Sequence, residues 1–117
     1  YGVCVAPNLA NIGWYDLSSE GWSHEVGLLN ANSWGLYDMH GNVQEWCNDR
    51  FDEQYYFYLN IHGPLTNPFG PTFGDERVVR GGYFFSAAAD CRSAARDSRF
   101  PSNASNDTGF RVALTSN

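Results

Sequence analysis

The chain has 117 residues, of which 43% are hydrophobic and 16% aromatic, so it carries enough apolar side chains for the core of one domain. Its 13 acidic residues outnumber its 7 basic residues, all of them arginine, and the net charge of −6 argues against nucleic-acid binding through a basic patch. No apolar run approaches about 18 residues, so we predict no membrane-spanning segment.

The first predicted element is a helix over residues 41–49. Asn42 is a candidate N-cap, and Glu45 follows three residues later, as in a capping box. The apolar side chains of this stretch share one helical face.

The remaining predicted elements are short strands separated by irregular segments. Residues 52–76 are rich in proline and glycine and are predicted to be a long loop. Strands are expected at 77–80, where two glycines follow, at 92–96, and at 110–114, where apolar side chains alternate. This pattern favours an α+β domain with few helices, short strands and long ordered loops.

The cysteines contain no CxxC pair, which excludes a zinc-ribbon spacing. We expect Cys4, Cys47 and Cys91 to be free thiols, and one long-range disulfide with one free thiol remains the alternative. The three histidines lack the spacing of a metal-binding helix, so we expect no zinc or iron site formed by this chain alone.

Three of the four tryptophans are candidates for the core. We expect Trp14, Trp34 and Trp46 to anchor it rather than to form a ligand platform.

Four phrases follow one another in a fixed order: WGLYDMHGNVQEW at 34–46, RVVRGG at 77–82, CRSA at 91–94 and GFRV at 109–112. In this order and spacing they closely resemble the formylglycine-generating-enzyme (sulfatase-modifying-factor) family, and the resemblance covers nearly the whole chain. It implies an α+β fold of the C-type lectin-like kind that this family adopts.

The family's domain normally has a comparable stretch before the region of Trp14. The resemblance therefore implies that residues 1–117 are a single domain that corresponds to the C-terminal part of the family's domain. The N-terminal part, either cleaved off or never present, is then a candidate partner.

Sulfatase-activating members of that family carry a reactive cysteine pair just after the two glycines, and the pair binds copper and activates oxygen. Here residues 83–90 contain no cysteine, and Cys91 falls on a structural strand of the family pattern. The resemblance therefore implies no catalytic residue and no copper. The alternative is a formylglycine-generating-enzyme-like domain with an enzymatic or accessory role.

The resemblance also implies a calcium site. Its ligands would be side-chain oxygens of Asp38 and Glu45 and main-chain carbonyls of Gly41 and Val43, and such hard oxygen ligands suit Ca²⁺. The alternative is that Asp38 ends a turn and Glu45 completes the capping box, with no ion.

Residues 83–108 contain no Lys, Glu, Gln, Met or Trp, although these types supply 12 of residues 1–82. Every residue there can be encoded by a codon ending in C, as expected of randomised Asn codons. This alphabet resembles the variable region of diversity-generating-retroelement proteins, several of which use the same lectin-like fold. The resemblance implies a non-catalytic protein that binds a protein or cell-surface ligand. The alternative is an ordinary Asn- and Ser-rich loop of a non-diversified relative.

Within this segment the resemblance separates displayed positions from fixed ones. The displayed, ligand-binding positions are Tyr83, Phe84, Phe85, Ser86, Ala87, Asp90, Asp97, Ser98, Arg99, Phe100, Asn103 and Asn106. We expect exposed side chains there, because a core position cannot accept tyrosine in one copy and aspartate in another. The fixed positions, expected to be buried, hydrogen-bonded or conformationally constrained, are Arg80, Gly81, Gly82, Arg92, Arg96, Gly109 and Phe110.

Overall fold

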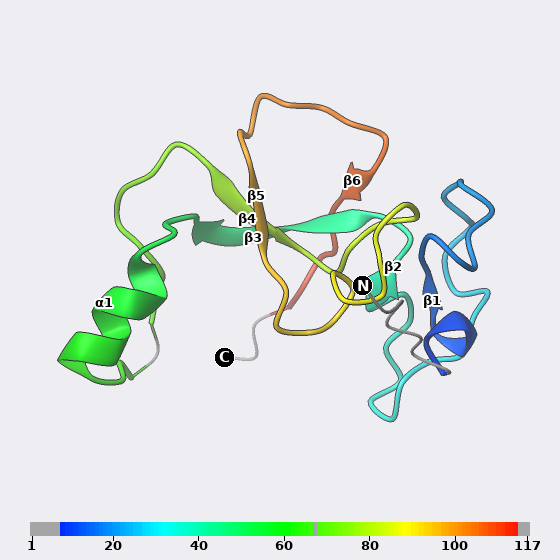
Figure 1. The fold of residues 1–117 in the computed structure, drawn as a ribbon, viewed down its shortest axis with the longest axis horizontal. Helices are drawn as coiled ribbons and strands as arrows, with labels where there is room; N and C mark the ends of the chain where they lie inside the picture. Colours follow the sequence, from blue (N-terminus) through cyan, green and yellow to red (C-terminus); the bar gives the residue numbers. More distant parts are fainter. Residues whose placement is uncertain (1–7, 67, 115–117) are drawn as a thin grey trace.

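The computed structural model describes residues 8–66 and 68–114 (Figure 1). Its elements are, in chain order, the 3-10 helix η1 (Leu9–Asn11), β1 (Gly13–Trp14), β2 (His40–Gly41), β3 (Gln44–Arg50), α1 (Tyr55–His62), β4 (Arg77–Arg80), β5 (Asp97–Arg99) and β6 (Thr108–Gly109). Short strands, few helices and long ordered connections confirm the predicted α+β class. Within these described ranges, no helix is long and apolar enough to cross a membrane.

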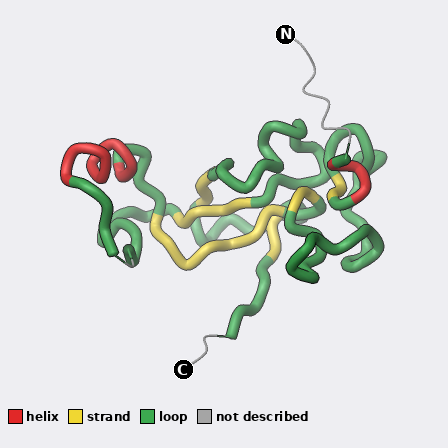
Figure 2. The backbone as a smooth tube through the Cα atoms, turned by 90° about the horizontal axis from the view of Figure 1, so that it is seen from below, coloured by secondary structure: helices red, strands yellow, loops and turns green. Residues whose placement is uncertain are grey.

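A four-stranded sheet in the order β5-β4-β3-β6 occupies the middle of the molecule. β4 is antiparallel to both of its neighbours, β3 and β5, whereas β6 is parallel to β3. The parallel pair β1–β2 and η1 lie at one end of the molecule, and α1 lies at the other (Figures 1 and 2). The central sheet thereby holds both ends of the segment between β4 and β6.

The predicted helix over residues 41–49 is wrong, because most of this stretch forms β3. Asn42 has a φ of 67°, and its side chain is bonded to the main chain of His24. The Asn42 Oδ1 accepts from the His24 N–H at 2.7 Å, and Nδ2 donates to the His24 carbonyl at 3.0 Å, so it caps nothing. Trp46 lies opposite Val79 on β4, and an aromatic residue across from a β-branched one stabilises a strand.

The predicted loop over residues 52–76 contains α1, so that prediction is wrong for Tyr55–His62. The helix ends at Gly63, whose φ is 88° and whose N–H donates to the Leu59 carbonyl at 2.8 Å. None of its side chains is buried. An aromatic run with no alternation of apolar and polar residues, and with no side-chain N-cap bond, gives little helical signal in the sequence.

The strand predictions are confirmed in part. Residues 77–80 form β4, but residues 92–96 form a turn and a short irregular stretch, and the strand begins only at Asp97. Residues 110–114 continue from β6 without strand pairing, and Figure 2 shows this segment leaving the body of the domain. Alternating apolar residues fit a strand only where a neighbouring strand offers hydrogen bonds, so the prediction fails there.

The core is small and lies beside η1 and β1. Leu9, Tyr15 and Cys91 are buried against one another. Val79 of β4 is fully buried in the sheet, and Phe84 is buried just after it. The core therefore connects the first elements of the chain to the segment that follows β4.

The tryptophans differ in their surroundings. Trp14 is half-buried and stacks on His24 with ring centroids 3.8 Å apart, and Trp46 is half-buried in β3. Trp34 is 85% exposed, so its prediction as a core anchor is wrong. Its backbone N–H donates to the Asn32 carboxamide at 2.9 Å, which holds a tight turn and leaves the indole in solvent.

Candidate functional site

The segment over residues 83–108 leaves the sheet after β4, makes a series of turns, returns as β5 and crosses to β6 (Figure 1). Ten of the twelve predicted ligand-binding side chains are exposed or half-buried. The exposed ones are Phe85, Ala87, Asp90, Asp97, Phe100, Asn103 and Asn106, and the half-buried ones are Tyr83, Ser98 and Arg99.

Phe84 and Ser86 are buried, at 5% and 6% exposure, so the prediction that they are displayed is wrong. The Phe84 carbonyl accepts from the Ser19 hydroxyl at 2.6 Å, and the Phe84 N–H donates to the Asn42 carbonyl at 3.0 Å. The Ser86 hydroxyl accepts from the Tyr83 N–H at 2.9 Å. Phe84 thus bonds the turn to the scaffold and the Ser86 hydroxyl closes it, and these hydrogen bonds satisfy polar atoms that burial removes from water.

The three neighbouring rings at 83–85 brace one another. Phe85, 61% exposed, packs on buried Phe84 with ring centroids 4.9 Å apart. The ring of Tyr83 meets both phenylalanines edge-on, at 5.5 and 6.4 Å. Contacts of this kind restrict ring motion, so Phe85 presents a rigid apolar surface to solvent.

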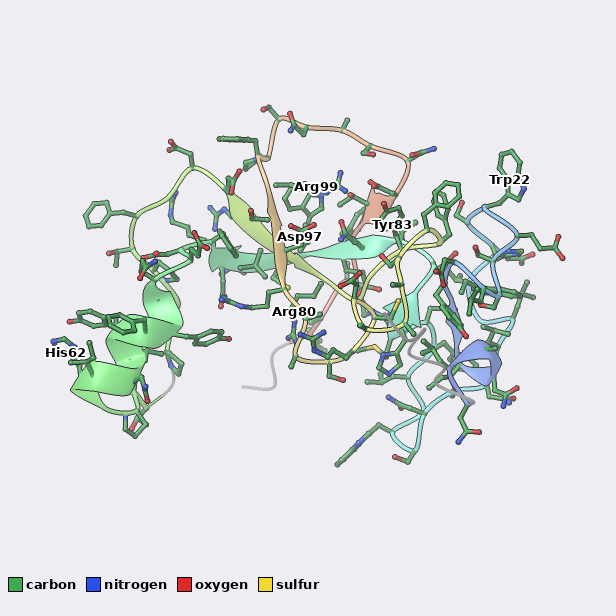
Figure 3. The ribbon with its side chains drawn as sticks, viewed as in Figure 1. Trp22, His62, Arg80, Tyr83, Asp97 and Arg99 are labelled. Atoms are coloured by element: carbon green, nitrogen blue, oxygen red, sulfur yellow. The ribbon has the colours of Figure 1, made fainter. Side chains whose placement is uncertain are left out.

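The β5 end of the segment is held by a polar network (Figure 3). Arg99 donates to Asp107 at 2.8 Å and to the Gln44 carboxamide at 3.2 Å, and Gln44 donates to Asp97 at 3.4 Å. Burial raises the pKa of Asp107, but hydrogen bonds from Ser105 and Thr108 and the charge of Arg99 outweigh it, so the pKa is lowered overall. The side chain of Arg99 is therefore committed to the scaffold.

The prediction for the fixed positions holds for some of them. Gly81 and Gly82 have φ values of 93° and 71°, and Arg92 donates to the Ala89 carbonyl at 2.6 Å. The guanidinium carbon of Arg96 lies 4.0 Å from the ring centroid of Tyr56.

Two fixed positions depart from the prediction. Phe110 is 79% exposed, because it follows β6 in the segment that leaves the domain. Arg80 is exposed, and its side chain makes no hydrogen bond within residues 8–66 and 68–114. Gly109 is half-buried, and a Cβ there would lie 3.2 Å from Val43.

The four predicted calcium ligands line one cavity of about 450 Å³ together with Arg111. Asp38 has a φ of 55°, and its Oδ2 accepts from the Gly27 N–H at 2.8 Å, while its Oδ1 is buried without a partner. The Glu45 carboxylate binds the Arg111 guanidinium at 2.7 and 3.0 Å. The unpartnered oxygen and the hard donor set fit a calcium ion, and Arg111 is the group that would give up Glu45 to it.

The described thiols are free and shielded. Burial first, and then the charges of Asp90 and Asp16, raise the pKa of Cys91 to about 11. Burial also raises the pKa of Cys47, against the charge of Arg80. A thiol with a raised pKa is a weak nucleophile and a weak metal ligand at neutral pH. Cys4 lies outside the described residues.

The side chains of His24 and His40 are hydrogen-bonded to main-chain carbonyls of the fold. The Nε2 of His24 is 2.8 Å from the Ser19 carbonyl, and the Nδ1 of His40 is 2.7 Å from the Cys91 carbonyl. His62 lies on α1 at the far end of the molecule (Figure 3). In the part of the chain that the structure describes, no three His, Cys, Asp or Glu side chains gather into a metal-binding group.

Sequence reasoning misses the contact between α1 and the segment before β5. Tyr56 and Phe51 lie under Arg96, at 4.0 and 5.6 Å from its guanidinium carbon. The run of aromatic residues at 55–58 is a signal that something cationic or apolar packs there, but it does not name the partner.

Comparison with known proteins places this geometry in a family. Residues 4–116 match the family model described as Sulfatase-modifying factor enzyme 1-like domain. The chain is 41% identical over 91 residues to the formylglycine-generating enzyme of Streptomyces coelicolor, and the aligned region covers 75% of this chain and 28% of that enzyme. It is 43% identical over 83 residues to the serine/threonine-protein kinase pkn1 of Chlamydia caviae, and the aligned region covers 71% of this chain and 13% of the kinase. The chain thus spans less than a third of the length of these relatives.

Two solved structures have a similar fold. Variable protein 1 of Treponema denticola is 32% identical, with a TM-score of 0.74 over 93% of this chain and 38% of that protein. PvdO from Pseudomonas aeruginosa is 27% identical, with a TM-score of 0.70 over 86% of this chain and 38% of that protein.

Proposed function

The chain belongs to the family of sulfatase-modifying factor enzyme 1-like domains and has a C-type lectin-like fold, and from this premise we propose that it is a non-catalytic protein that binds a ligand through residues 83–108. The observation that carries the proposal is that some residues of this segment hold it to the rest of the domain while others are exposed to solvent. The segment's main chain is hydrogen-bonded to the scaffold at Phe84 and the Ser86 hydroxyl closes its first turn, while Phe85, Asp90 and Phe100 reach solvent.

The displayed surface suits the binding of a protein or a cell-surface molecule. Rigid aromatic side chains supply contact area with little loss of conformational entropy, and small neighbours leave room for a partner. Phe85 packs on buried Phe84, and the small side chains of Ala87 and Asn103 in the same segment are exposed. The likeness to a variable protein supports diversification at these exposed positions, although the family also contains enzymes.

The chemistry of the thiols supports a role without catalysis. Residues 83–90 contain no cysteine, and Cys91 beneath Gly82 is buried with a pKa of about 11. The alternative, an enzymatic or accessory role, is favoured by the 41% identity to a formylglycine-generating enzyme. Conversion of a CxPxR peptide by the purified chain, with copper and oxygen supplied, would establish the alternative and exclude the non-catalytic role.

A swap of exposed side chains tests the binding surface. The variant combines Phe85→Asp, Asp90→Tyr, Phe100→Asn, Asn103→Tyr and Asn106→Ser. We expect it to fold with a melting temperature close to that of the parent, whereas the single control Phe84→Asp should lose about 3–5 kcal/mol or more. A library randomised at the same five positions and selected against streptavidin should yield binders. Failure of the fivefold variant to fold would contradict the proposal.

We further propose that this domain packs against a partner, and that this partner is the N-terminal part of the family's domain. Its accessible surface is 8749 Å², against about 6400 Å² for a typical folded protein of its mass. Phe110, Val112 and Leu114 are 79%, 85% and 98% exposed along one segment. Nile red fluorescence should be strong with the parent and fall when these three residues are replaced by serine.

Calcium is proposed for the cavity between Asp38 and Glu45. The ion would take the unpartnered Asp38 Oδ1 and the Glu45 carboxylate, with carbonyls of Gly41 and Val43. Its role would be to fix the main chain between β2 and β3, on which the turn at Phe84 rests through Asn42.

A further inference from the structure

A cavity of about 300 Å³ lies where the first turn of α1 meets the central sheet, apart from the displayed side chains and from the proposed calcium ligands. β3 contributes Cys47, Asp49 and Arg50 to it, β4 contributes Val78 and Arg80, and α1 contributes Tyr55 and Tyr56, with Pro71 and Arg96 from the connecting segments. The volume is at the lower end of the range of small-ligand sites.

The lining of this cavity is strongly basic for so acidic a chain. Three of the seven arginines, Arg50, Arg80 and Arg96, face one carboxylate, Asp49, although the net charge of the chain is −6. Within residues 8–66 and 68–114 the ion pairs are Arg99–Asp107 and Arg111–Glu45, so none of these three arginines has a carboxylate within 4.0 Å.

The register of the sheet brings two of these charges together. Val79 pairs with Asp97 on the antiparallel strands β4 and β5, and Arg80 and Arg96 follow directly beyond this last pair, where both line the cavity. Like charges that face each other across two strands destabilise the pairing. Asp90 and Asp97 line a second cavity together with the two arginines, but both lie beyond ion-pairing distance of them.

A second pair of facing arginines shows how the chain otherwise handles this problem. Arg77 lies opposite Arg99 in the same ladder, but Arg99 is neutralised by Asp107 at 2.8 Å and Arg77 donates to the Asn48 carbonyl. Arg80 lies opposite Glu45 of β3, but Glu45 is bound to Arg111, and within the described residues neither Arg80 nor Arg96 has a carboxylate within 4.0 Å. An anion between them would supply the missing negative charge.

The groups around the cavity are also held in place for binding. The guanidinium carbon of Arg96 lies over the ring of Tyr56 at 4.0 Å and over that of Phe51 at 5.6 Å, and these contacts restrict the side chain. Arg50 donates to the Gly74 carbonyl at 2.5 Å, which fixes its side chain at the cavity wall. A guanidinium held in one orientation binds a carboxylate or a phosphate through two parallel hydrogen bonds.

We propose that this cavity is a binding site for a small ligand that carries an oxyanion, a carboxylate or a phosphate, held between Arg80 and Arg96 with Arg50 at the rim. The tyrosine rings of α1 provide an apolar wall for the rest of the ligand. The site does not depend on the displayed surface, because none of the exposed positions of residues 83–108 lines it.

Thermal melts at constant ionic strength test the site, with inorganic phosphate and benzoate as probes and chloride as the reference anion. A ligand that binds the native state alone raises the melting temperature as its concentration passes its Kd. We expect a saturable rise with phosphate, with benzoate or with both, and the probe that acts identifies the oxyanion. Melting curves that match those in chloride for both probes would overturn the proposal.

Arginine variants locate the effect. Arg80→Gln and Arg96→Gln should each weaken binding about 10- to 100-fold, because each removes a charge-assisted pair of hydrogen bonds. Arg77→Gln is the matched control: it lies on the same strand, makes the same change in charge and does not line the cavity. Equal binding by all three variants would refute the site.

Alkylation of Cys47 gives a second readout that needs no change in melting temperature. The thiol lines the cavity and is half-buried, so a bound ligand should slow its reaction with N-ethylmaleimide several-fold. Peptide mass spectrometry separates it from the other cysteines. A rate that phosphate and benzoate leave unchanged would count against occupancy of this cavity.

Discussion

Replacing Gly82 by alanine tests how the turn that carries the displayed residues is held. The φ of Gly82 is +71°, and a Cβ there would lie 2.6 Å from the Cys91 sulfur, 3.2 Å from its Cα and 3.3 Å from the Asp90 carbonyl oxygen. The left-handed conformation costs a non-glycine residue about 1–2 kcal/mol, and overpacking against a buried neighbour adds about 1–3 kcal/mol. The expected loss is therefore about 2–5 kcal/mol of the roughly 5–15 kcal/mol that such a domain has.

Gly35→Ala is the control for this variant. Gly35 has a φ of +74°, but a Cβ there meets nothing within 4 Å, so it reports the conformational cost without the contact. Urea unfolding of the parent and both variants gives the free energies of unfolding, and the excess loss in Gly82→Ala measures the contact with Cys91. Equal losses in the two variants would refute the packing argument.

Three further outcomes are expected. Because the pKa of Asp107 is lowered from its ordinary value of 3.8, its contribution to stability is complete above that value and is lost as the pH falls through the lower folded value; Asp107→Asn should therefore flatten the acid limb of a stability curve against pH, and an unchanged limb would contradict the Arg99 network. Millimolar calcium should raise the melting temperature of the parent but not of Asp38→Asn, and a rise in both would move the ion elsewhere. Iodoacetamide should modify Cys47 faster than Cys91, because Cys91 is 1% exposed with a pKa near 11; the reverse order would show that the segment after β4 opens.

The sequence predicted the fold class well, because that prediction rests on whole phrases rather than on single elements. RVVRGG predicts a strand that ends at two glycines, and β4 ends where it should, with both glycines at positive φ. The local prediction around Asn42 failed because a capping residue and a turn residue have the same chemistry. Its amide is bonded to His24, 18 residues upstream, and no local pattern reports that distant partner.

The exposure of the candidate ligand-binding residues was also predicted only in part. The pattern of variable and fixed positions correctly predicts that the side chains of Phe85 and Asp90 are exposed. It does not distinguish exposed from buried side chains at adjacent variable positions. Burial of Phe84 and Ser86 follows from hydrogen bonds to Ser19 and to the neighbouring turn, which depend on how two distant segments meet. Which side chains of a loop point inward is a property of the scaffold under it.

The cavity beside α1 could not be predicted from the sequence, because it also depends on how distant segments meet. In the sequence, Arg80 and Arg96 are 16 residues apart, and the family resemblance treats both as fixed positions. Only the antiparallel register of β4 and β5 makes them neighbours, and only α1, which no periodicity predicts, brings Tyr56 under Arg96. A residue that is fixed for the sake of the fold can therefore also supply a binding group, because its orientation is already determined by packing. For this chain, the fixed arginines deserve the same experimental scrutiny as the displayed side chains.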